Sequence, residues 1–300
     1  MPVKVFQHKV FQHIKEAIGH LDPDEIRKHS ERPLRLFLYA YSEAAYREME
    51  NFFAPPELSA ERRAEIACAI YRAAEGCVPC ESHDLEIYYE DSPGGGLARA
   101  NQVFAFHAQN PGQVVHDVLD QRPDLAVPLA VHIHPFREEV SRRIVKKVAR
   151  ENALFALATA LPDVIPFISL PWAIGEFASD TAVITANQIR MAFLLAAASD
   201  RDVGYREQKG EIVSIALGAF GWRALARELA GKIPLGGGLI PKAAIAYAGT
   251  RVAGMSIERY YRIGCGYSRA ERRLAYEQAL ERGKTFALSL LDGFKSKKLS

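Results

Sequence analysis

The sequence contains little cysteine and no long, uninterrupted apolar run. Four cysteines among 300 residues are too few for a disulfide framework. Residues 1–20 alternate charged and apolar groups, and they lack the apolar run of about 7–15 residues that defines a secretory signal peptide. These absences predict a chain that stays in the reducing cytoplasm.

Signatures of common enzymes are missing as well. The sequence contains neither GxSxG nor HExxH, and it has no GxxxxGK[ST] phosphate loop. A glycine-rich stretch at 233–241, IPLGGGLIP, precedes Lys242, but Pro241 stands between the glycines and the lysine, and no Ser or Thr follows. We therefore predict a protein without catalytic activity and without a cofactor.

Charge divides the chain into two halves. Residues 1–133 contain 13 Lys and Arg against 20 Asp and Glu, whereas residues 134–300 contain 25 against 16, so the net charges are −7 and +9. The sign changes where the apolar segments begin. An acidic half beside a basic, apolar half predicts one domain that is surrounded by water and one domain that binds anionic surfaces. Docking of the two halves on each other is the alternative interpretation.

Residues 1–31 are predicted to form an N-terminal amphipathic helix. Its apolar stripe recurs at helical spacing and consists of Val3, Phe6, Val10, Ile14 and Ala17. Such a helix packs on the body of the protein or touches lipid.

Residues 32–135 are predicted to form a small α/β domain. Strands are expected at 34–40, 85–89 and 102–107, and helices at 43–53, 60–75, 111–121 and 124–133. Such units often bind nucleotides at the turn after the first strand. Here that turn, residues 39–43, has no glycine and no lysine, and Glu43 would repel a phosphate. We therefore expect the domain to have the fold of a nucleotide-binding domain but to lack the residues that bind a nucleotide phosphate.

The sharpest metal-like pattern is Cys77-x-x-Cys80-x-x-His83, whose spacing suits zinc. A fourth ligand would have to come from His107, His132 or His134. No second CxxC or HxxxH pair accompanies the pattern. We interpret the segment as a turn and predict no bound metal, and we expect the His132-x-His134 pair to face solvent.

Residues 137–150 form the clearest helical pattern. At about 100° per residue, the basic side chains fall on one side of the helix and the apolar side chains on the other. The basic set is Arg142, Arg143, Lys146, Lys147 and Arg150, and the apolar set is Val140, Ile144, Val145 and Val148. A basic face that leads into an apolar stretch predicts a helix at an anionic membrane surface. A solvated face on a soluble bundle is the alternative.

Two apolar segments follow, at 153–175 and 181–199. The first is interrupted by three prolines and one acid, and the second by Asn187, Gln188 and Arg190. Neither is a clean run of about 20 apolar residues, which a membrane-spanning helix needs. We therefore predict a hairpin of two apolar helices that dips into one leaflet or packs against its neighbours.

Ionisable groups in these segments are expected to be paired. Asp163 and Arg190 are candidate buried charges, and we expect the acids of this region to pair with Arg190 or Arg223. Trp172 is a candidate for the membrane or partner surface, because tryptophan is enriched at membrane interfaces.

The apolar helical domain is predicted to extend over residues 136–264. Small residues recur within 242–261 at a spacing that allows tight helix–helix contact. They are Ala244, Ala248, Gly249, Ala253 and Gly254. Residues 265–300 are expected to form a C-terminal helix, which begins at a Ser268–Glu271 capping box, and a basic tail.

Residues 140–262 resemble a known family. ENALFALATALPDVIPFISLPWAIGEFASDTAVITANQIRMAFLLAA and GAFGWRALARELAGKIPLGGGLIPKAAIAYAGTRVAG are similar to the bacterial GTPase-associated domain of unknown function, also found in YcjF-like inner-membrane proteins. The shared features are P-x-x-x-P after an apolar helix, TANQIRM, and a small-residue helix after a glycine-rich loop. The resemblance implies association with a membrane and with a GTPase of the Era-like class. No catalytic residue is assigned to this family, so the resemblance implies none here. By analogy of order, residues 34–53 are expected to be the relic of a strand–loop–helix of a lost GTPase.

Together these patterns predict an α+β protein with a small, degenerate GTPase-like α/β domain and an all-α, apolar helical domain. We expect a non-catalytic scaffold or regulatory partner at the cytoplasmic face of the cytoplasmic membrane, with anionic lipid as its main partner. A GTPase partner and a homo-oligomer are compatible with the sequence, whereas no nucleic acid is expected. Two alternatives stay open: a soluble GTPase partner whose helical domain is an interaction module, and a nucleotide-binding enzyme with an atypical site.

Overall fold

The computed structural model describes residues 12, 14–73, 83–90, 103–159, 180–218 and 239–297, with side chains up to residue 293. The chain divides into two compact units. A helical unit comprises residues 1–25, 142–196 and 202–300, and an α/β unit comprises residues 26–141 and 197–201. The α+β class predicted from the sequence is confirmed. The predicted boundaries at 31/32 and 135/136 lie six residues from the unit boundaries at 25/26 and 141/142.

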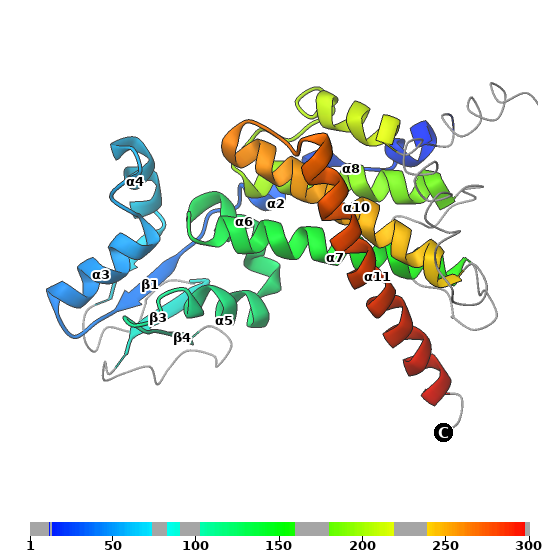
Figure 1. Ribbon diagram of the computed structural model, residues 1–300. Helices are drawn as coiled ribbons and strands as arrows, with labels where there is room; N and C mark the ends of the chain where they lie inside the picture. Colours follow the sequence, from blue (N-terminus) through cyan, green and yellow to red (C-terminus); the bar gives the residue numbers. More distant parts are fainter. Residues whose placement is uncertain are drawn as a thin grey trace, which may run out of the picture. The chain divides into compact units, whose positions relative to one another are not determined.

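A parallel, four-stranded sheet forms the centre of the α/β unit (Figure 1). Its strands are β1 (Leu36–Tyr39), β2 (Ile70–Arg72), β3 (Leu85–Tyr89) and β4 (Val103–Phe106), and they lie in the order β2-β1-β3-β4. Leu36 is in register with Ile70 of β2 and with Leu85 of β3. The strand order reverses between β1 and β3, which is where doubly wound sheets usually bind ligands.

The run LRLFLYA is buried mainly on one face of the sheet. Leu36 and Leu38 of β1 are completely buried, whereas Phe37 and Tyr39 are half-buried. On the half-buried face Phe37 stacks on Tyr71 of β2, and Tyr39 stacks on Tyr88 of β3. The alternation of buried and half-buried side chains is the period of two that a strand imposes.

Capping serines begin two helices of this unit at the predicted residues. The Oγ atom of Ser42 accepts a hydrogen bond from Ala45 N at the start of α3 (Glu43–Phe53), and the Oγ atom of Ser59 accepts one from Arg62 N at the start of α4 (Ala60–Ala67). Helices α5 (Gln113–Gln121) and α6 (Ala126–His132) follow, separated by a 3-10 turn at Pro123–Leu125. Helices α2 (Pro23–Ser30) and α7 (Phe136–Ala158) each begin in one unit and end in the other.

The prediction of one helix over residues 60–75 is wrong in its second half. Helix α4 ends at Ala67, and Ile70–Arg72 form strand β2 instead. The residues at 70 and 71, isoleucine and tyrosine, favour strands. Their pairing with β1 supplies backbone hydrogen bonds that a last helical turn would otherwise have to provide.

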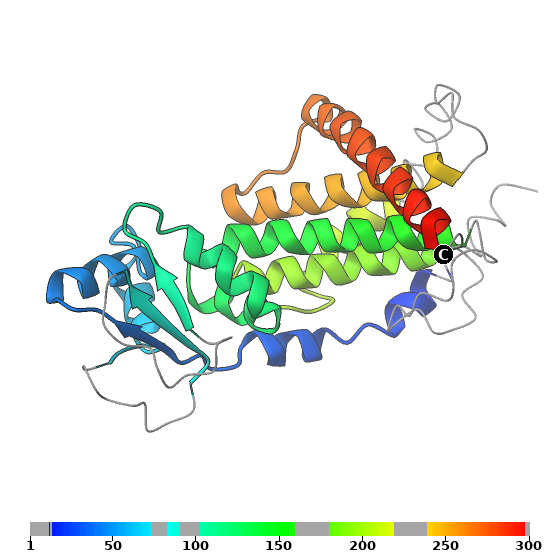
Figure 2. The same cartoon turned by 90° about the horizontal axis from the view of Figure 1, so that it is seen from below.

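In the helical unit, α7, α8 (Asp180–Ala198) and α10 (Leu239–Ile263) lie side by side, and α11 (Arg269–Lys297) crosses α10 obliquely (Figure 2). A Cβ atom on Gly254 of α10 would lie only 2.7 Å from Val145 Cγ2 and 2.9 Å from Met191 Sδ. A Cβ atom on Gly283 of α11 would lie 2.9 Å from the carbonyl oxygen of Ala244. Small residues therefore allow these helices to approach closely, as predicted for α10.

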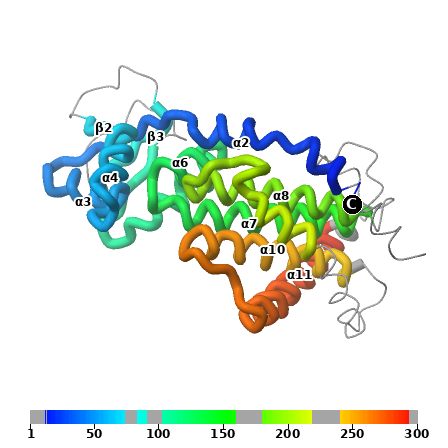
Figure 3. Tube along the Cα trace, turned by 90° about the horizontal axis from the view of Figure 1, so that it is seen from above, coloured from blue at the N-terminus to red at the C-terminus, as the bar shows by residue number. Residues whose placement is uncertain are grey.

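Both ends of the chain contribute to this unit. Residues 14–19 are helical and lie beside α8 (Figure 3), where Ile14 and Ala17 pack against Ala182 and Ala186. The prediction of a single helix over residues 1–31 is wrong in its described part, because this helix ends at Gly19 and a separate helix, α2, begins at Pro23. The rest of the predicted stripe lies outside the described residues. At the start of α11, Ser268 N donates to Glu271 Oε2 at 2.8 Å and Glu271 N donates to Ser268 Oγ at 3.3 Å, which confirms the capping box.

Candidate functional site

A buried polar network connects α7, α8 and α10. Asn152 Nδ2 donates to Thr250 Oγ1 at 2.8 Å, and Asn187 Nδ2 donates to Asn152 Oδ1 at 2.9 Å. Gln188 Nε2 also donates to Thr250 Oγ1, at 3.1 Å. The polar residues that interrupt the apolar sequence of α8 therefore find hydrogen-bond partners inside the unit, as buried amides require.

The network continues to the candidate buried charge, Arg190. Asn187 Nδ2 donates to Glu151 Oε2 at 3.2 Å, and Arg190 Nη1 lies 3.7 Å from the same carboxylate oxygen. Among the described residues the acidic partner of Arg190 is thus Glu151 of α7. Asp180 binds Lys242, so the expected pairing of this acid with Arg190 is wrong, while Arg223 lies outside the described residues. The other candidate, Asp163, lies outside the described residues.

Three helix ends meet at one end of the helical unit. Lys242 Nζ, in the first turn of α10, lies 2.5 Å from Asp180 Oδ2, at the first residue of α8. Thr159, directly after α7, donates from Oγ1 to Asp180 Oδ2 at 3.2 Å. The chain therefore leaves for residues 160–179 and returns from them at this same end. That stretch, ALPDVIPFISLPWAIGEFAS, contains only two charged residues.

Helix α7 has a basic side and a buried side within the helical unit. Arg142, Lys147 and Arg150 are exposed, and Arg143 and Lys146 are half-buried. On the opposite side the valines are buried at 3 % exposure or less, namely Val140, Val145 and Val148. The two-sided distribution expected from the sequence is therefore present for the valines, whereas Ile144 of the expected apolar set is only half-buried. Trp172, the other surface candidate, lies outside the described residues.

Three of the basic groups on α7 have no acidic partner in the part of the chain that the structure describes. Among the described residues, Lys146, Lys147 and Arg150 form no ion pair. The guanidinium of Arg150 lies 5.5 Å from the ring centroid of Phe286, a cation–π contact that holds the side chain against α11. This face thus presents positive charge to whatever lies outside the unit.

Among the described residues one helix, α8, is long and apolar enough to cross a membrane, with a mean hydropathy of 1.3 over its most apolar window. However, 78 % of that window is buried inside the protein. A core helix of a globular protein meets the same criteria, so α8 by itself is weak evidence for a membrane span.

In the α/β unit, the carboxyl edge of the sheet carries paired charges. Arg72, at the end of β2, lies 2.6 Å from Glu50 Oε1 and 2.7 Å from Glu43 Oε2. Hydrogen bonds from Arg47 and Arg72 lower the pKa of Glu43, so its carboxylate stays ionised. Two carboxylates thus neutralise Arg72, and the described part of this edge has no free cation for a phosphate.

His83, the one described member of the metal-like pattern, has another partner. Its Nε2 atom lies 2.6 Å from Glu86 Oε1, and the Tyr88 hydroxyl donates to Glu86 Oε2 at 2.8 Å. Glu86 is buried at 3 % exposure. The described residues contain no group of three metal-ligating side chains, and Cys77 and Cys80 lie outside them.

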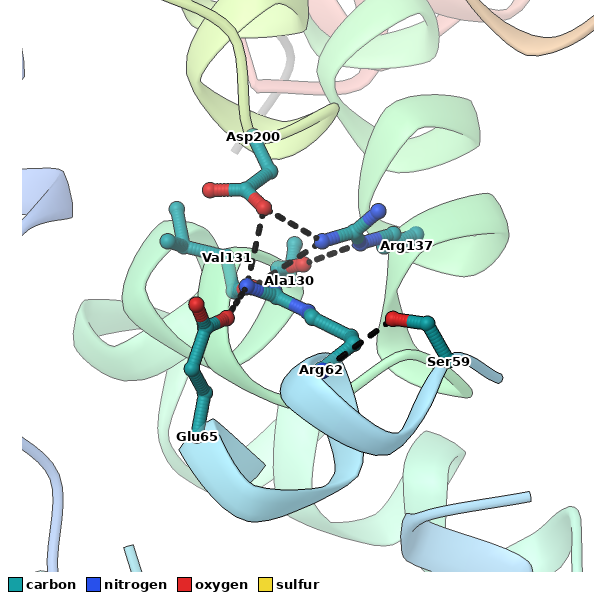
Figure 4. Close-up of polar contacts among 7 residues, drawn as sticks. All are labelled: Ser59, Arg62, Glu65, Ala130, Val131, Arg137 and Asp200. Atoms are coloured by element: carbon teal, nitrogen blue, oxygen red, sulfur yellow. Dashed lines mark hydrogen bonds and ion pairs between the residues drawn. The ribbon is translucent and has the colours of Figure 1, made fainter. Parts of the chain in front are cut away.

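Two arginines of the α/β unit converge on one carboxylate (Figure 4). Arg62 Nη1 lies 3.0 Å from Asp200 Oδ2, and Arg137 Nη2 lies 3.1 Å from the same atom. Both guanidiniums also donate to the carbonyl oxygen of Val131, near the C-terminal end of α6. Asp200 has a positive φ of 57°, which aspartate tolerates better than most residues. The arginines therefore cap α6 and fix residues 197–201 within this unit.

His134 lies near these arginines. Desolvation, followed by the positive charges of Arg137 and Arg62, lowers its pKa, so the neutral imidazole is favoured. His132 donates from Nε2 to the carbonyl oxygen of Arg32 at 3.1 Å and is half-buried, whereas His134 is exposed. The expectation that both histidines face solvent is thus correct for His134 and wrong for His132.

Comparison of the chain with protein-family models, with characterised proteins and with solved structures finds no match. The resemblance of residues 140–262 to the GTPase-associated domain therefore stays a prediction from the sequence. The fold and the charge distribution define an α+β protein with a parallel-sheet unit and a helical unit that exposes a basic helix face.

Proposed function

We propose that the helical unit binds an anionic membrane surface through the basic side of α7, and that the protein serves there as a non-catalytic scaffold or regulatory partner at the cytoplasmic face. The observation that carries the proposal is that Lys146, Lys147 and Arg150 of α7 have no acidic partner among the described residues and lie opposite a row of buried valines. Because the valines anchor α7 in the core of the helical unit, its basic side chains stay on the surface of the unit.

The net charge of the helical unit and the basic groups on α7 both support this assignment. The helical unit contains 26 Lys and Arg against 17 Asp and Glu, a net charge of +9, whereas the α/β unit has a net charge of −7. A basic residue near an anionic lipid surface contributes about 1 kcal/mol, so Lys146, Lys147 and Arg150 together supply about 3 kcal/mol. Because salt screens such interactions, binding should weaken steeply as ionic strength rises.

The apolar stretch at 160–179 supports the same assignment. It is attached at the end of the unit where Thr159, Asp180 and Lys242 meet, directly after the basic helix. Basic residues beside apolar sequence are the combination by which peripheral proteins bind lipid. Since α8 is mostly buried within the unit, we propose peripheral binding and no span by this helix.

Co-sedimentation of the full chain with lipid vesicles tests the proposal. One variant replaces Lys146, Lys147 and Arg150 by glutamine, and a control variant replaces three exposed basic residues elsewhere in the unit, Arg206, Lys209 and Arg269. Vesicles containing phosphatidylglycerol should bind the wild type, and neutral phosphatidylcholine vesicles should not. The α7 variant should bind at least about tenfold more weakly, from roughly 1 kcal/mol per charge, and more weakly than the control.

A soluble partner of a GTPase is the second candidate, and the burial of α8 favours it. The one described helix that is long and apolar enough to cross a membrane is already covered by protein, as in the core of a soluble helical protein. Under this alternative the wild type stays in the supernatant with every vesicle composition. The resemblance to the GTPase-associated domain then points to a GTPase of the Era-like class as the partner, which a binding assay with such a GTPase would test. The remaining candidate, a nucleotide-binding enzyme with an atypical site, requires saturable binding of GTP or ATP.

A further inference from the structure

A cavity of about 480 Å³ lies within the helical unit, between helical residues 209–218, α10 and the start of α11. This volume falls in the range of roughly 300–1,000 Å³ that is typical of small-molecule sites. Three apolar side chains with exposures of 8 % or less line the cavity, namely Ile215, Val252 and Ile257. The volume and these three side chains thus fit the apolar part of a molecule of modest size.

Gln188 of α8 provides a polar group in this cavity. The exposed fraction of Gln188 is only 5 %, and the residue lines the cavity. Its amide makes one hydrogen bond among the described residues, from Nε2 to Thr250 Oγ1. The other amide atom, the carbonyl oxygen, accepts no hydrogen bond from the described residues. A buried amide with unused capacity is costly unless a ligand or water pairs with it.

The charges of the lining residues indicate whether the end of the ligand at Gln188 is charged or neutral. The charged residues of the lining are Glu211 and Arg272, and their charges are of opposite sign. The polar group at Gln188 is itself uncharged. A ligand that carried an ion to Gln188 would lose its hydration without gaining an opposite charge there, which is strongly unfavourable.

We infer that this cavity binds a small, mainly apolar molecule whose inner end is an uncharged amide or hydroxyl group that pairs with Gln188. The side chains of Ile215, Val252 and Ile257 contact its apolar body. The same Gln188 amide is linked through Thr250 to the buried network of Asn152 and Asn187, so an occupied cavity stabilises the packing of α7, α8 and α10.

The test uses three probes with the same six-carbon chain and different ends: hexanamide, hexanoate and hexylammonium. Their binding to the full chain is measured by saturation-transfer NMR and calorimetric titration. Hexanamide should bind saturably and at least about tenfold more tightly than either charged probe, because only the neutral end can be buried at Gln188 without an unpaired charge. Equal affinity for all three probes, or no saturable binding of hexanamide, would overturn the proposal.

Two variants locate the site. Ala253→Phe fills the cavity, because Ala253 lines it, whereas Ala270→Phe makes the same substitution at an exposed position of α11 outside the lining. The first should weaken hexanamide binding at least tenfold, and the second should leave it within about twofold. Gln188→Met removes the amide at similar volume and should weaken hexanamide about three- to tenfold, the contribution of one hydrogen bond. Binding that is unchanged in both Ala253→Phe and Gln188→Met contradicts the assignment.

Discussion

Asn152 and Thr250 share a hydrogen bond of 2.8 Å, and both residues are completely buried. Thr250 Oγ1 also accepts a hydrogen bond from Gln188 Nε2, so one hydroxyl of α10 accepts hydrogen bonds from side-chain amides of α7 and α8. The small residues around it bring the three helices close enough for such short bonds. The Thr250 hydroxyl thus provides a hydrogen-bond acceptor for a buried polar residue of α8. Its removal should therefore lower the stability of the folded protein.

Thr250→Val should lower the free energy of unfolding by about 1–3 kcal/mol, because the amides of Asn152 and Gln188 lose a shared acceptor while staying buried. Thr285→Val is the matched control, since the Thr285 hydroxyl is exposed and donates only to the carbonyl oxygen of Glu281 within its own helix. That control should change stability by less than about 0.5 kcal/mol. Urea denaturation followed by circular dichroism measures both. Equal effects of the two substitutions would show that the network contributes no more than a surface hydroxyl.

The contact between α10 and α11 predicts opposite effects of one substitution at two glycines of the same helix. Gly283→Ala should destabilise the protein by about 1–3 kcal/mol, because the new methyl group would meet backbone atoms of Ala244 at 2.9–3.0 Å. Gly293→Ala meets nothing within 4 Å and should stabilise α11 by up to about 1 kcal/mol through its higher helix propensity. Thermal unfolding of the two variants measures the difference. A Gly283→Ala protein as stable as Gly293→Ala would mean that the helices are not in tight contact.

His134 predicts a dependence of stability on pH. Because its pKa is lowered in the folded state, the unfolded chain takes up a proton more readily as the pH falls. The contribution of His134 to stability is therefore complete above the unfolded pKa of about 6.5 and decreases as the pH falls below it. His134→Gln should remove this decrease, so the stability difference between variant and wild type should change between pH 8 and pH 5. Parallel stability profiles for the two proteins would contradict the prediction.

Local patterns made several elements predictable from the sequence. Helix α3 and strand β3 begin and end at the predicted residues, because a capping serine marks the first and a bounded apolar run marks the second. The basic and buried sides of α7 also follow directly from helical periodicity. These features depend on neighbours within a few residues, which a sequence shows without knowledge of the fold.

Contacts between distant residues could not be predicted in the same way. Strand β2 has only three residues and depends on its pairing with β1. The partners that satisfy Asn187 and Gln188 come from two other helices, and no pattern near α8 identifies Asn152 or Thr250. The cavity at Gln188 likewise exists only because α8, α10, α11 and residues 209–218 all contribute to its lining.

The most direct test of the proposed membrane contact is the environment of a single position on α7 when vesicles are present. The four cysteines at 68, 77, 80 and 265 are replaced by serine, and a polarity-sensitive dye is attached to either Lys147→Cys or Arg273→Cys, two exposed positions of the helical unit. Phosphatidylglycerol vesicles should shift the emission of the dye at 147 to shorter wavelength and leave the dye at 273 nearly unchanged. No shift at 147, or equal shifts at the two positions, would contradict a membrane contact through the basic side of α7.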